Sequence, residues 1–294
     1  MPLATPAQFG DMIDAARGGG FAYPAVNVSS SQTLNAALRG FAEAGSDGIV
    51  QITTGGAAYA AGAPGDMALG ARAIAEYARV VAEGWPVLVA LHSDHCPPRR
   101  STPSCAPSWP TPEPAGAADE EPLFAGHMFD GSALPLDENL DIAEPLLAEC
   151  AALGVVLEVQ CGVVGGEEDG VHGEPGERLY TTRDDLMRVV DRLGAGERGR
   201  YLLAATFGNV HGVYAPEHVR LRPEILREGQ RALAERRGEE ARFDYVFHGG
   251  SGSDPADVAA AVQHGVVKMN LDTDAQYAFS ERPPVTPSAT TTAC

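Results

Sequence analysis

Three histidines of this chain follow short hydrophobic runs and stand beside other polar residues. They are His95 in Ser93-Asp94-His95, His211 in Asn209-Val210-His211, and His248 in His248-Gly249-Gly250-Ser251. One such histidine alone is more often a structural or solvated loop residue. Three imidazoles with an open fourth position are the arrangement of a catalytic zinc. Since no HxxxH or CxxC pair fixes the geometry locally, the prediction depends on a fold that brings the three segments together.

Carboxylates and glycines accompany the histidines. Asp94 precedes His95, and Glu168 lies in an acidic triplet, Glu167-Glu168-Asp169. Carboxylates beside a metal can take up and release protons during a reaction. The structural alternatives are a helix cap for Asp94 and a solvated loop for the triplet. The glycines after His248 leave backbone N–H groups open to an oxyanion such as phosphate, although glycine turns also serve structure alone.

The elements that must position these residues are eight β-rich runs alternating with helical patterns. The runs are YPAVNV from Tyr23, DGIVQIT, PVLVALHSDH, GHMFDGSAL, VVLEVQCG, YLLAATFGNVHG, FDYVFHGGSG and GVVKMNL. After the first run, serines that can cap a helix precede helical spacing up to Gly45. Strands alternating with helices predict an α/β fold with a parallel sheet, and eight of them predict a (β/α)8 TIM barrel. The alternative is an open doubly wound sheet.

Composition excludes several classes of function. The chain has 294 residues, 44% of them hydrophobic, and a formal net charge of −19. One large core is therefore expected, whereas binding to nucleic acid or to an anionic membrane surface is not. The N-terminus lacks a signal-peptide pattern, and no run approaches the ~18 apolar residues of a membrane span. Five scattered cysteines, an odd number, predict a reducing, cytoplasmic location.

Several segments resemble signature sequences of the class II, zinc-dependent fructose-bisphosphate aldolases, and they occur in that family's order. They are FAYPAVNV, QITTGGAAYAAG, ALHSDHC, HMFDGSALPLDENL, LEVQCGVVGGEEDGV, FGNVHGVY, FHGGSGS and GVVKMNLDTDAQYAF. The resemblance covers roughly residues 1–96 and 120–281, and it favours the fructose-bisphosphate branch over the tagatose-bisphosphate branch. It implies reversible cleavage of fructose 1,6-bisphosphate to dihydroxyacetone phosphate and glyceraldehyde 3-phosphate, by a homodimer or larger assembly.

The resemblance also implies roles for individual residues. His95, His211 and His248 would hold the catalytic Zn²⁺, and a requirement for a monovalent cation stays open. Glu168 would remove a proton beside the substrate carbonyl, and Asp94 would exchange the hydroxyl proton of the aldol step. The implied substrate-binding residues are Asn27, Thr53, Gly212, Gly249, Gly250, Ser251, Asn270, Asp272 and Thr273. Thr53 stands where the family usually has serine and keeps the hydroxyl.

Three further positions bear on the chemistry. The resemblance implies a second metal position at Asp130 and Gln160, but Gln160 replaces the family's glutamate, so weaker metal binding is expected there. Lys268 is the only lysine of the chain. A zinc mechanism needs no Schiff-base lysine, and the glycine-rich phosphate cradle argues against a zinc hydrolase.

Residues 97–119 and 282–294 depart from the family pattern. Both are proline-rich and aperiodic, which usually means a loop and a disordered tail. Family-like codons for DTFVRP and HYDGVL, read one base late, give the TPSCA of 102–106 and the TTTAC that ends the chain. We therefore hypothesise two frame-shifted segments, one barrel domain over 1–281, an aberrant tail, and missing C-terminal helices. The alternative function is an inactive homologue that binds zinc and triose phosphate.

Overall fold

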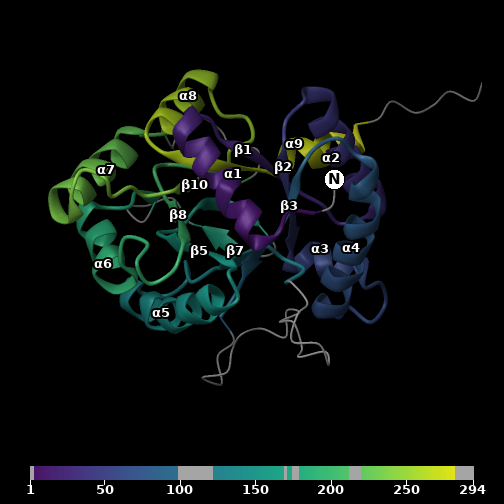
Figure 1. The fold of residues 1–294 in the computed structure, drawn as a ribbon, viewed down its shortest axis with the longest axis horizontal. Coiled ribbons are helices and arrows are strands. Elements are labelled where there is room, and N and C mark those ends of the chain that lie inside the picture. The colour runs from purple at the N-terminus through teal and green to yellow at the C-terminus, as the bar shows by residue number, and fades with distance from the viewer. Residues whose placement is uncertain (1–2, 99–121, 169–170, 174–178, 212–219, 282–294) are drawn as a thin grey trace, which may run out of the picture.

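A closed barrel of parallel strands forms the centre of the molecule (Figure 1). The computed structural model describes residues 3–98, 122–168, 171–173, 179–211 and 220–281, with the backbone alone for 165–168, 171–173 and 211. Within these ranges eight strands close in the order β1-β11-β10-β8-β5-β4-β3-β2. They are β1 (Tyr23–Asn27), β2 (Gly48–Thr53), β3 (Val89–Cys96), β4 (Gly126–Phe129), β5 (Val156–Cys161), β8 (Tyr201–Ala205), β10 (Tyr245–Phe247) and β11 (Val266–Leu271). The predicted (β/α)8 TIM barrel is confirmed.

Helices surround the barrel and connect its strands. They are α1 (Pro6–Gly19), α2 (Ser31–Ala44), α3 (Thr54–Ala60), α4 (Met67–Val81), the 3-10 turn η1 (Ala82–Gly84), α5 (Leu136–Ala152), α6 (Arg183–Leu193), α7 (Glu224–Arg237), α8 (Pro255–Gln263) and α9 (Thr273–Ser280). The predicted helix after β1 begins after the cap Ser30 and ends at Gly45, whose φ of 62° favours glycine. Most of the first departing segment, from residue 99, and all of 282–294 lie outside the described residues.

The N-terminal helix α1 closes one end of the barrel. Its buried residues Phe9 and Ile13 share a hydrophobic cluster with small residues inside the strands, such as Ala25 and Ala90. Figure 1 shows α1 lying across the strands. Small side chains inside the barrel leave room for the helix, so this end is filled with apolar atoms.

Polarity changes along the inside of the strands. On β3, Ala90 belongs to the apolar cluster, whereas His92 and Asp94 further along are fully buried polar residues. On β5, Val156 is likewise followed by the fully buried Glu158. Alternate residues of a strand point to the same side, so the polar residues lie towards the carboxyl ends of the strands. That end is where barrel enzymes place their active sites.

Gly126 of β4 makes space for this polar layer. A Cβ atom there would lie 2.2 Å from Cδ2 of His92 and 3.0 Å from Cε1 of Phe9. We expect Gly126→Ala to lower the free energy of unfolding by about 1–3 kcal/mol, because the ring must shift in a packed interior. Urea denaturation measures this change. The control is Gly40→Ala in the exposed part of α2, where a new Cβ meets nothing within 4 Å and stability is expected to stay equal or rise.

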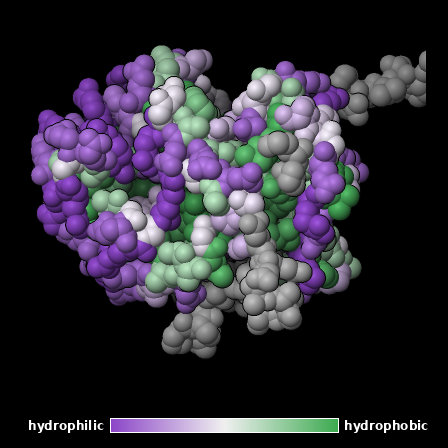
Figure 2. All heavy atoms as spheres, viewed as in Figure 1, coloured by the Kyte–Doolittle hydropathy of each residue, from purple (hydrophilic) through white to green (hydrophobic). Residues whose placement is uncertain are grey.

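The surface differs between the two sides of the barrel. The face over α6 and α7 is largely hydrophilic, whereas hydrophobic residues gather on the side of α3 and α4 (Figure 2). Tyr59, Leu69 and Val80 are exposed on those two helices. Among the described residues, no helix combines the length and apolarity required to span a bilayer.

Candidate active site

The end of β3 supplies two neighbouring polar groups. Asp94 is fully buried, and the His95 side chain is 10% exposed. His95 has a φ of 48°, which a non-glycine residue rarely adopts. Such backbone strain persists where the surrounding structure holds it, often at functional sites. The backbone N–H of His95 donates to Sδ of Met128 at 3.3 Å.

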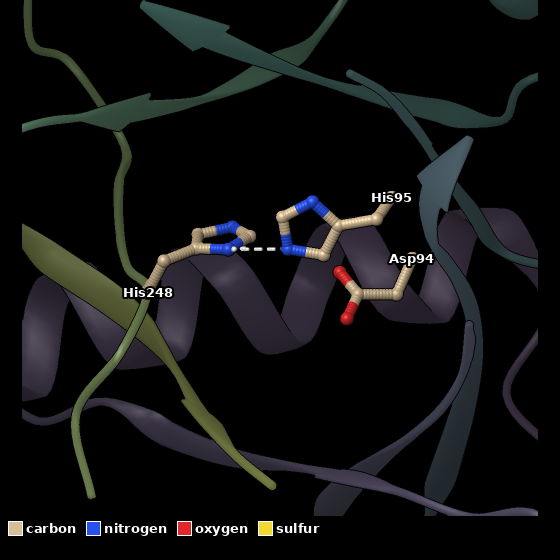
Figure 3. A group of neighbouring side chains, drawn as sticks. All are labelled: Asp94, His95 and His248. Carbon is tan, nitrogen blue, oxygen red and sulfur yellow. Dashed lines mark hydrogen bonds between the residues drawn. The ribbon is translucent and has the colours of Figure 1, made fainter. Parts of the chain in front are cut away.

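His248, directly after β10, faces His95 (Figure 3). Nδ1 of His248 lies 3.1 Å from Nε2 of His95, and the rings are nearly perpendicular, at 87°. One ligand atom from each of Asp94, His95 and His248 lies within 4.8 Å of the others. Two imidazole nitrogens and a carboxylate that converge in this way form a donor set that suits zinc.

Each imidazole is oriented by a carboxylate at its other nitrogen. Nδ1 of His95 lies 2.8 Å from Asp130, and Nε2 of His248 lies 2.6 Å from Glu158. Burial alone would raise the pKa of Asp130, but hydrogen bonds from His95 and Ser132 lower it to about 2. Metal-binding histidines usually have such a carboxylate partner, which fixes the ring and its tautomer. The geometry of both rings therefore fits a metal between them.

Three side-chain amides surround Asp94. Asn27 donates to its carboxylate at 3.2 Å, Gln51 at 3.3 Å and Asn270 at 3.4 Å. Gln51 also donates to Oδ1 of Asn27 at 2.7 Å, which fixes both amides. Three neutral amides from β1, β2 and β11 thus hold the carboxylate of Asp94 in place.

A buried ion pair lies behind His248. Oε2 of Glu158 accepts from Lys268 at 2.8 Å, and both side chains are almost fully buried. Burial alone would raise the pKa of Glu158, but the Lys268 ammonium and the hydrogen bond from His248 lower it. Burial lowers the pKa of His248, against the effect of Glu158. These directions favour an ionised Glu158 and a neutral His248, the state in which an imidazole can bind a metal.

The predicted His211 and Glu168 lie in a small second sheet. Its strands are β6 (Gly165–Glu168), β7 (Val171–Gly173) and β9 (Val210–His211), in the order β7-β6-β9. Gly166 is the parallel partner of His211, and Glu168 is the antiparallel partner of Val171. The backbone therefore brings the acidic segment beside the segment of the third histidine. Gly212 lies outside the described residues.

The predicted phosphate-binding segments come together after β10 and β11. Oγ of Ser251 accepts from the backbone N–H of Asp274 at 3.2 Å, which ties the first segment to α9 and its first residue, Thr273. Asp272 accepts from Gln276 at 2.8 Å. Gly249 has a φ of 61°, and a Cβ there would lie 2.3 Å from the carbonyl oxygen of Val210. Glycine is therefore required where this turn passes β9.

Gly250 and Thr53 each contact neighbouring elements at the carboxyl end of the barrel. A Cβ on Gly250 would meet Cε of Met269 at 2.5 Å, so this turn packs closely against β11. Thr53 pairs with Asp94 across β2 and β3 and accepts from the backbone N–H of Gly56 at 2.9 Å. Its hydroxyl thus caps α3 at the same end of the barrel as Asp94.

The two residues of the predicted second metal position have separate partners. Asp130 contacts His95 and accepts from the backbone N–H of Ser132 at 2.9 Å. Nε2 of Gln160 donates to the carbonyl of Gly162 at 3.4 Å. Oε1 of Gln160 is buried and accepts no hydrogen bond from the described part of the chain. Asp130 thus contacts His95, and the group that Gln160 could offer to a metal is its side-chain amide oxygen.

Three buried polar residues of the site were not among the predicted ones, namely Gln51, His92 and Glu158. Each is fully buried. Gln51 and Glu158 lie between apolar neighbours in their strands, and His92 lies between Leu91 and Ser93. A charged residue in a run such as VVLEVQC was the available signal, because buried charges need partners. Sequence alone did not reveal those partners, since they come from strands that are far apart along the chain.

The fold is a parallel (β/α)8 barrel. Two facing histidines and a buried aspartate at the carboxyl-terminal end of its strands form a candidate metal centre. A sequence model described as "Fructose-bisphosphate aldolase class-II" matches residues 7–288. The chain belongs to this family.

Individual relatives agree with this assignment. The chain is 56% identical to a fructose-bisphosphate aldolase of Streptomyces galbus over 281 residues, which cover 95% of this chain and 83% of the relative. It is 52% identical to that of Mycobacterium leprae over 284 residues, 95% of this chain and 82% of the relative. The crystal structure of the Campylobacter jejuni fructose-bisphosphate aldolase matches with a TM-score of 0.76 at 36% identity, covering 95% and 79% of the two chains.

Proposed function

We propose that this chain catalyses the reversible cleavage of fructose 1,6-bisphosphate to dihydroxyacetone phosphate and glyceraldehyde 3-phosphate, with Zn²⁺ held by His95, His211 and His248. The observation that carries the proposal is the 3.1 Å approach of the inner ring nitrogens of His95 and His248 beside the buried Asp94. Two imidazoles and an adjacent carboxylate suit a metal ion that must leave a position for substrate. Family membership supplies the reaction.

The bound zinc would supply Lewis-acid polarisation of the substrate carbonyl. Asp94 takes the proton from the substrate hydroxyl during cleavage and returns it during condensation, while Asn27, Gln51 and Asn270 hold its carboxylate in place. Glu168 moves the proton at the carbon next to the carbonyl of dihydroxyacetone phosphate. The support for Glu168 is its position in β6, the strand that pairs with β9 and His211.

Phosphate binding falls to the segments after β10 and β11 in this proposal. Gly249, Gly250 and Ser251 present backbone N–H groups without bulky side chains, as phosphate cradles require. The Ser251–Asp274 hydrogen bond supports a joint role with Asn270, Asp272 and Thr273. Gly212, Asn27 and Thr53 complete the set of substrate-binding residues. Local N–H groups allow a chain of net charge −19 to bind an anionic sugar phosphate.

Four accompanying proposals concern the metal content, the assembly and the location of the protein. We propose a homodimer or larger assembly, an optional monovalent cation, and a weak second metal position at Asp130 and Gln160. A cytoplasmic location is supported by Cys96, Cys150 and Cys161, which are buried free thiols. Light scattering measures the assembly, and elemental analysis measures the metal content.

Cleavage by the purified, zinc-loaded chain tests the proposed function. Glyceraldehyde 3-phosphate and dihydroxyacetone phosphate should be released from fructose 1,6-bisphosphate, faster than the corresponding products from tagatose 1,6-bisphosphate. Circular dichroism of the same preparation reports folding. A folded, zinc-loaded chain that cleaves neither sugar would contradict the proposal and favour an inactive homologue.

A further inference from the structure

Lys268 occupies a central position in the polar interior of the barrel. It lies on β11 and is 1% exposed. Its ammonium donates to Oε2 of Glu158 and to Oδ1 of Asn270, at 2.8 Å in both cases. One cation thus holds two groups that reach different parts of the candidate active site.

The first branch leads to a metal ligand. With Oε2 engaged by Lys268, Oε1 of Glu158 lies 2.6 Å from Nε2 of His248. Glu158 pairs with the Lys268 ammonium, and an ionised carboxylate only accepts hydrogen bonds, so Nε2 of His248 carries a proton. Nδ1 of His248 is then the nitrogen that can bind a metal, and it lies 3.1 Å from Nε2 of His95 and 3.3 Å from the amide nitrogen of Asn270. The carboxylate therefore selects the tautomer that can bind metal.

The second branch leads to the proton-exchanging carboxylate. Because Oδ1 of Asn270 accepts from Lys268, the amide is fixed with Nδ2 directed to Oδ1 of Asp94, at 3.4 Å. A flipped amide would place a hydrogen-bond donor against the ammonium. Lys268 thereby determines which end of Asn270 faces Asp94.

The choice of lysine and the desolvation penalty of a buried ion pair also indicate a role in the site. Lys268 is the one lysine among the 21 lysines and arginines of the chain, and all the rest are arginines. A compact ammonium with three donors suits a fully buried position better than a guanidinium with five donors. A buried ion pair seldom adds stability over apolar residues of similar size. Apolar side chains would fill the barrel interior equally well, so packing alone does not explain the Lys268–Glu158 pair.

We propose that Lys268 is a positioning residue, which fixes Glu158 so that His248 presents Nδ1 to the metal, and fixes Asn270 so that its amide nitrogen faces Asp94. The inference rests on the proposed zinc-dependent function. Residues that orient metal ligands typically alter metal affinity about 10–100-fold when replaced. Lys268 variants should therefore show a change in zinc binding itself, which a residue that only fills space would not produce.

Zinc affinity of purified variants, measured by competition with a chromophoric chelator, tests the proposal. Lys268→Met and Glu158→Gln are each expected to raise the zinc Kd by about 10–100-fold. The matched control is Arg17→Met. Arg17 pairs with Asp244 at the opposite end of β10, 2.5 Å between Nη2 and Oδ2, away from the site. This variant should leave the zinc Kd and kcat unchanged.

A second arm covers the case in which Lys268→Met fails to fold because Glu158 is left as an unpaired buried charge. The double variant Lys268→Met/Glu158→Gln removes both charges, and its zinc Kd should stay raised about 10–100-fold. In the unaltered protein, nitrogen-15 NMR of the histidine rings should show the His248 proton on Nε2, with His248→Gln used for assignment.

The outcomes separate this inference from the proposed function. A His248 proton on Nδ1 of the metal-free chain, or a folded Lys268→Met chain with unchanged zinc Kd and kcat, would overturn the positioning role. If the unaltered chain neither binds zinc nor cleaves the sugar, the proposed function fails first.

Discussion

Replacing Asp94 with asparagine is expected to lower kcat for fructose 1,6-bisphosphate cleavage by about 10²–10⁴-fold, the usual contribution of a positioned acid or base. Asparagine keeps the shape of the side chain but does not exchange a proton at the substrate hydroxyl. The fold should survive, since asparagine can turn its oxygen towards Asn27 and Gln51 and so lose only the 3.4 Å bond from Asn270. Steady-state kinetics and the zinc content of the same sample measure the effect.

Asp244→Asn is the matched control for this substitution. Asp244 is also a buried aspartate next to a barrel strand, but it accepts from Arg17 at the other end of β10. Its replacement should lower stability and leave kcat within about twofold, because its side chain pairs with Arg17 and Arg200, outside the described part of the site. An Asp94→Asn enzyme that retained zinc and full kcat would show that another group handles the proton.

Replacing His95 with alanine is expected to abolish tight zinc binding and to lower kcat/KM by about 10³-fold or more, since Lewis-acid stabilisation is worth several kcal/mol and each 1.36 kcal/mol is tenfold. His95 is the better choice of the two facing histidines because its side chain is 10% exposed, whereas that of His248 is fully buried. Removing it therefore creates less buried empty space. Alanine also keeps a Cβ in the strained backbone, so strain is not relieved.

His127→Ala provides a control for the loss of an imidazole. His127 lies on β4 and bonds Oγ of Ser93 at 2.7 Å, and burial lowers its pKa to about 4. It is a neutral histidine near the same strand end, but it is not part of the converging set. Zinc binding should persist in this variant. Equal zinc binding and activity in His95→Ala would remove His95 from the metal centre.

The barrel could be predicted from the sequence because its physical causes are local. Alternating β-rich and helical patterns determine the order of the elements, and the serines before α2 and Gly45 after it act within one helical turn. Parallel strands must then place their carboxyl ends together. For the same reason the segments of His95 and His248 could be predicted to lie at that end, whereas the segment of His211 lies on β9 in the small second sheet.

The contacts around the histidines could not be predicted, because they depend on strand register. Gln51 aligns with His92 across β2 and β3, and Glu158 aligns with Met128 across β4 and β5. A shift by one residue would turn each of these side chains to the other face. Nothing in the local sequence predicts the φ of 48° at His95, which tertiary packing imposes. Likewise, the contact of Asp130 with His95 emerged only from the fold.

Zinc titration of the metal-free chain, with cleavage of fructose 1,6-bisphosphate followed at each addition, tests the central claim most directly. The account predicts that a chelator removes activity and that one equivalent of zinc per chain restores it. In His95→Ala, the same titration should show neither tight binding nor recovery. Full activity in the metal-free chain, or recovery equally well in His95→Ala, would contradict a zinc centre built on His95 and His248.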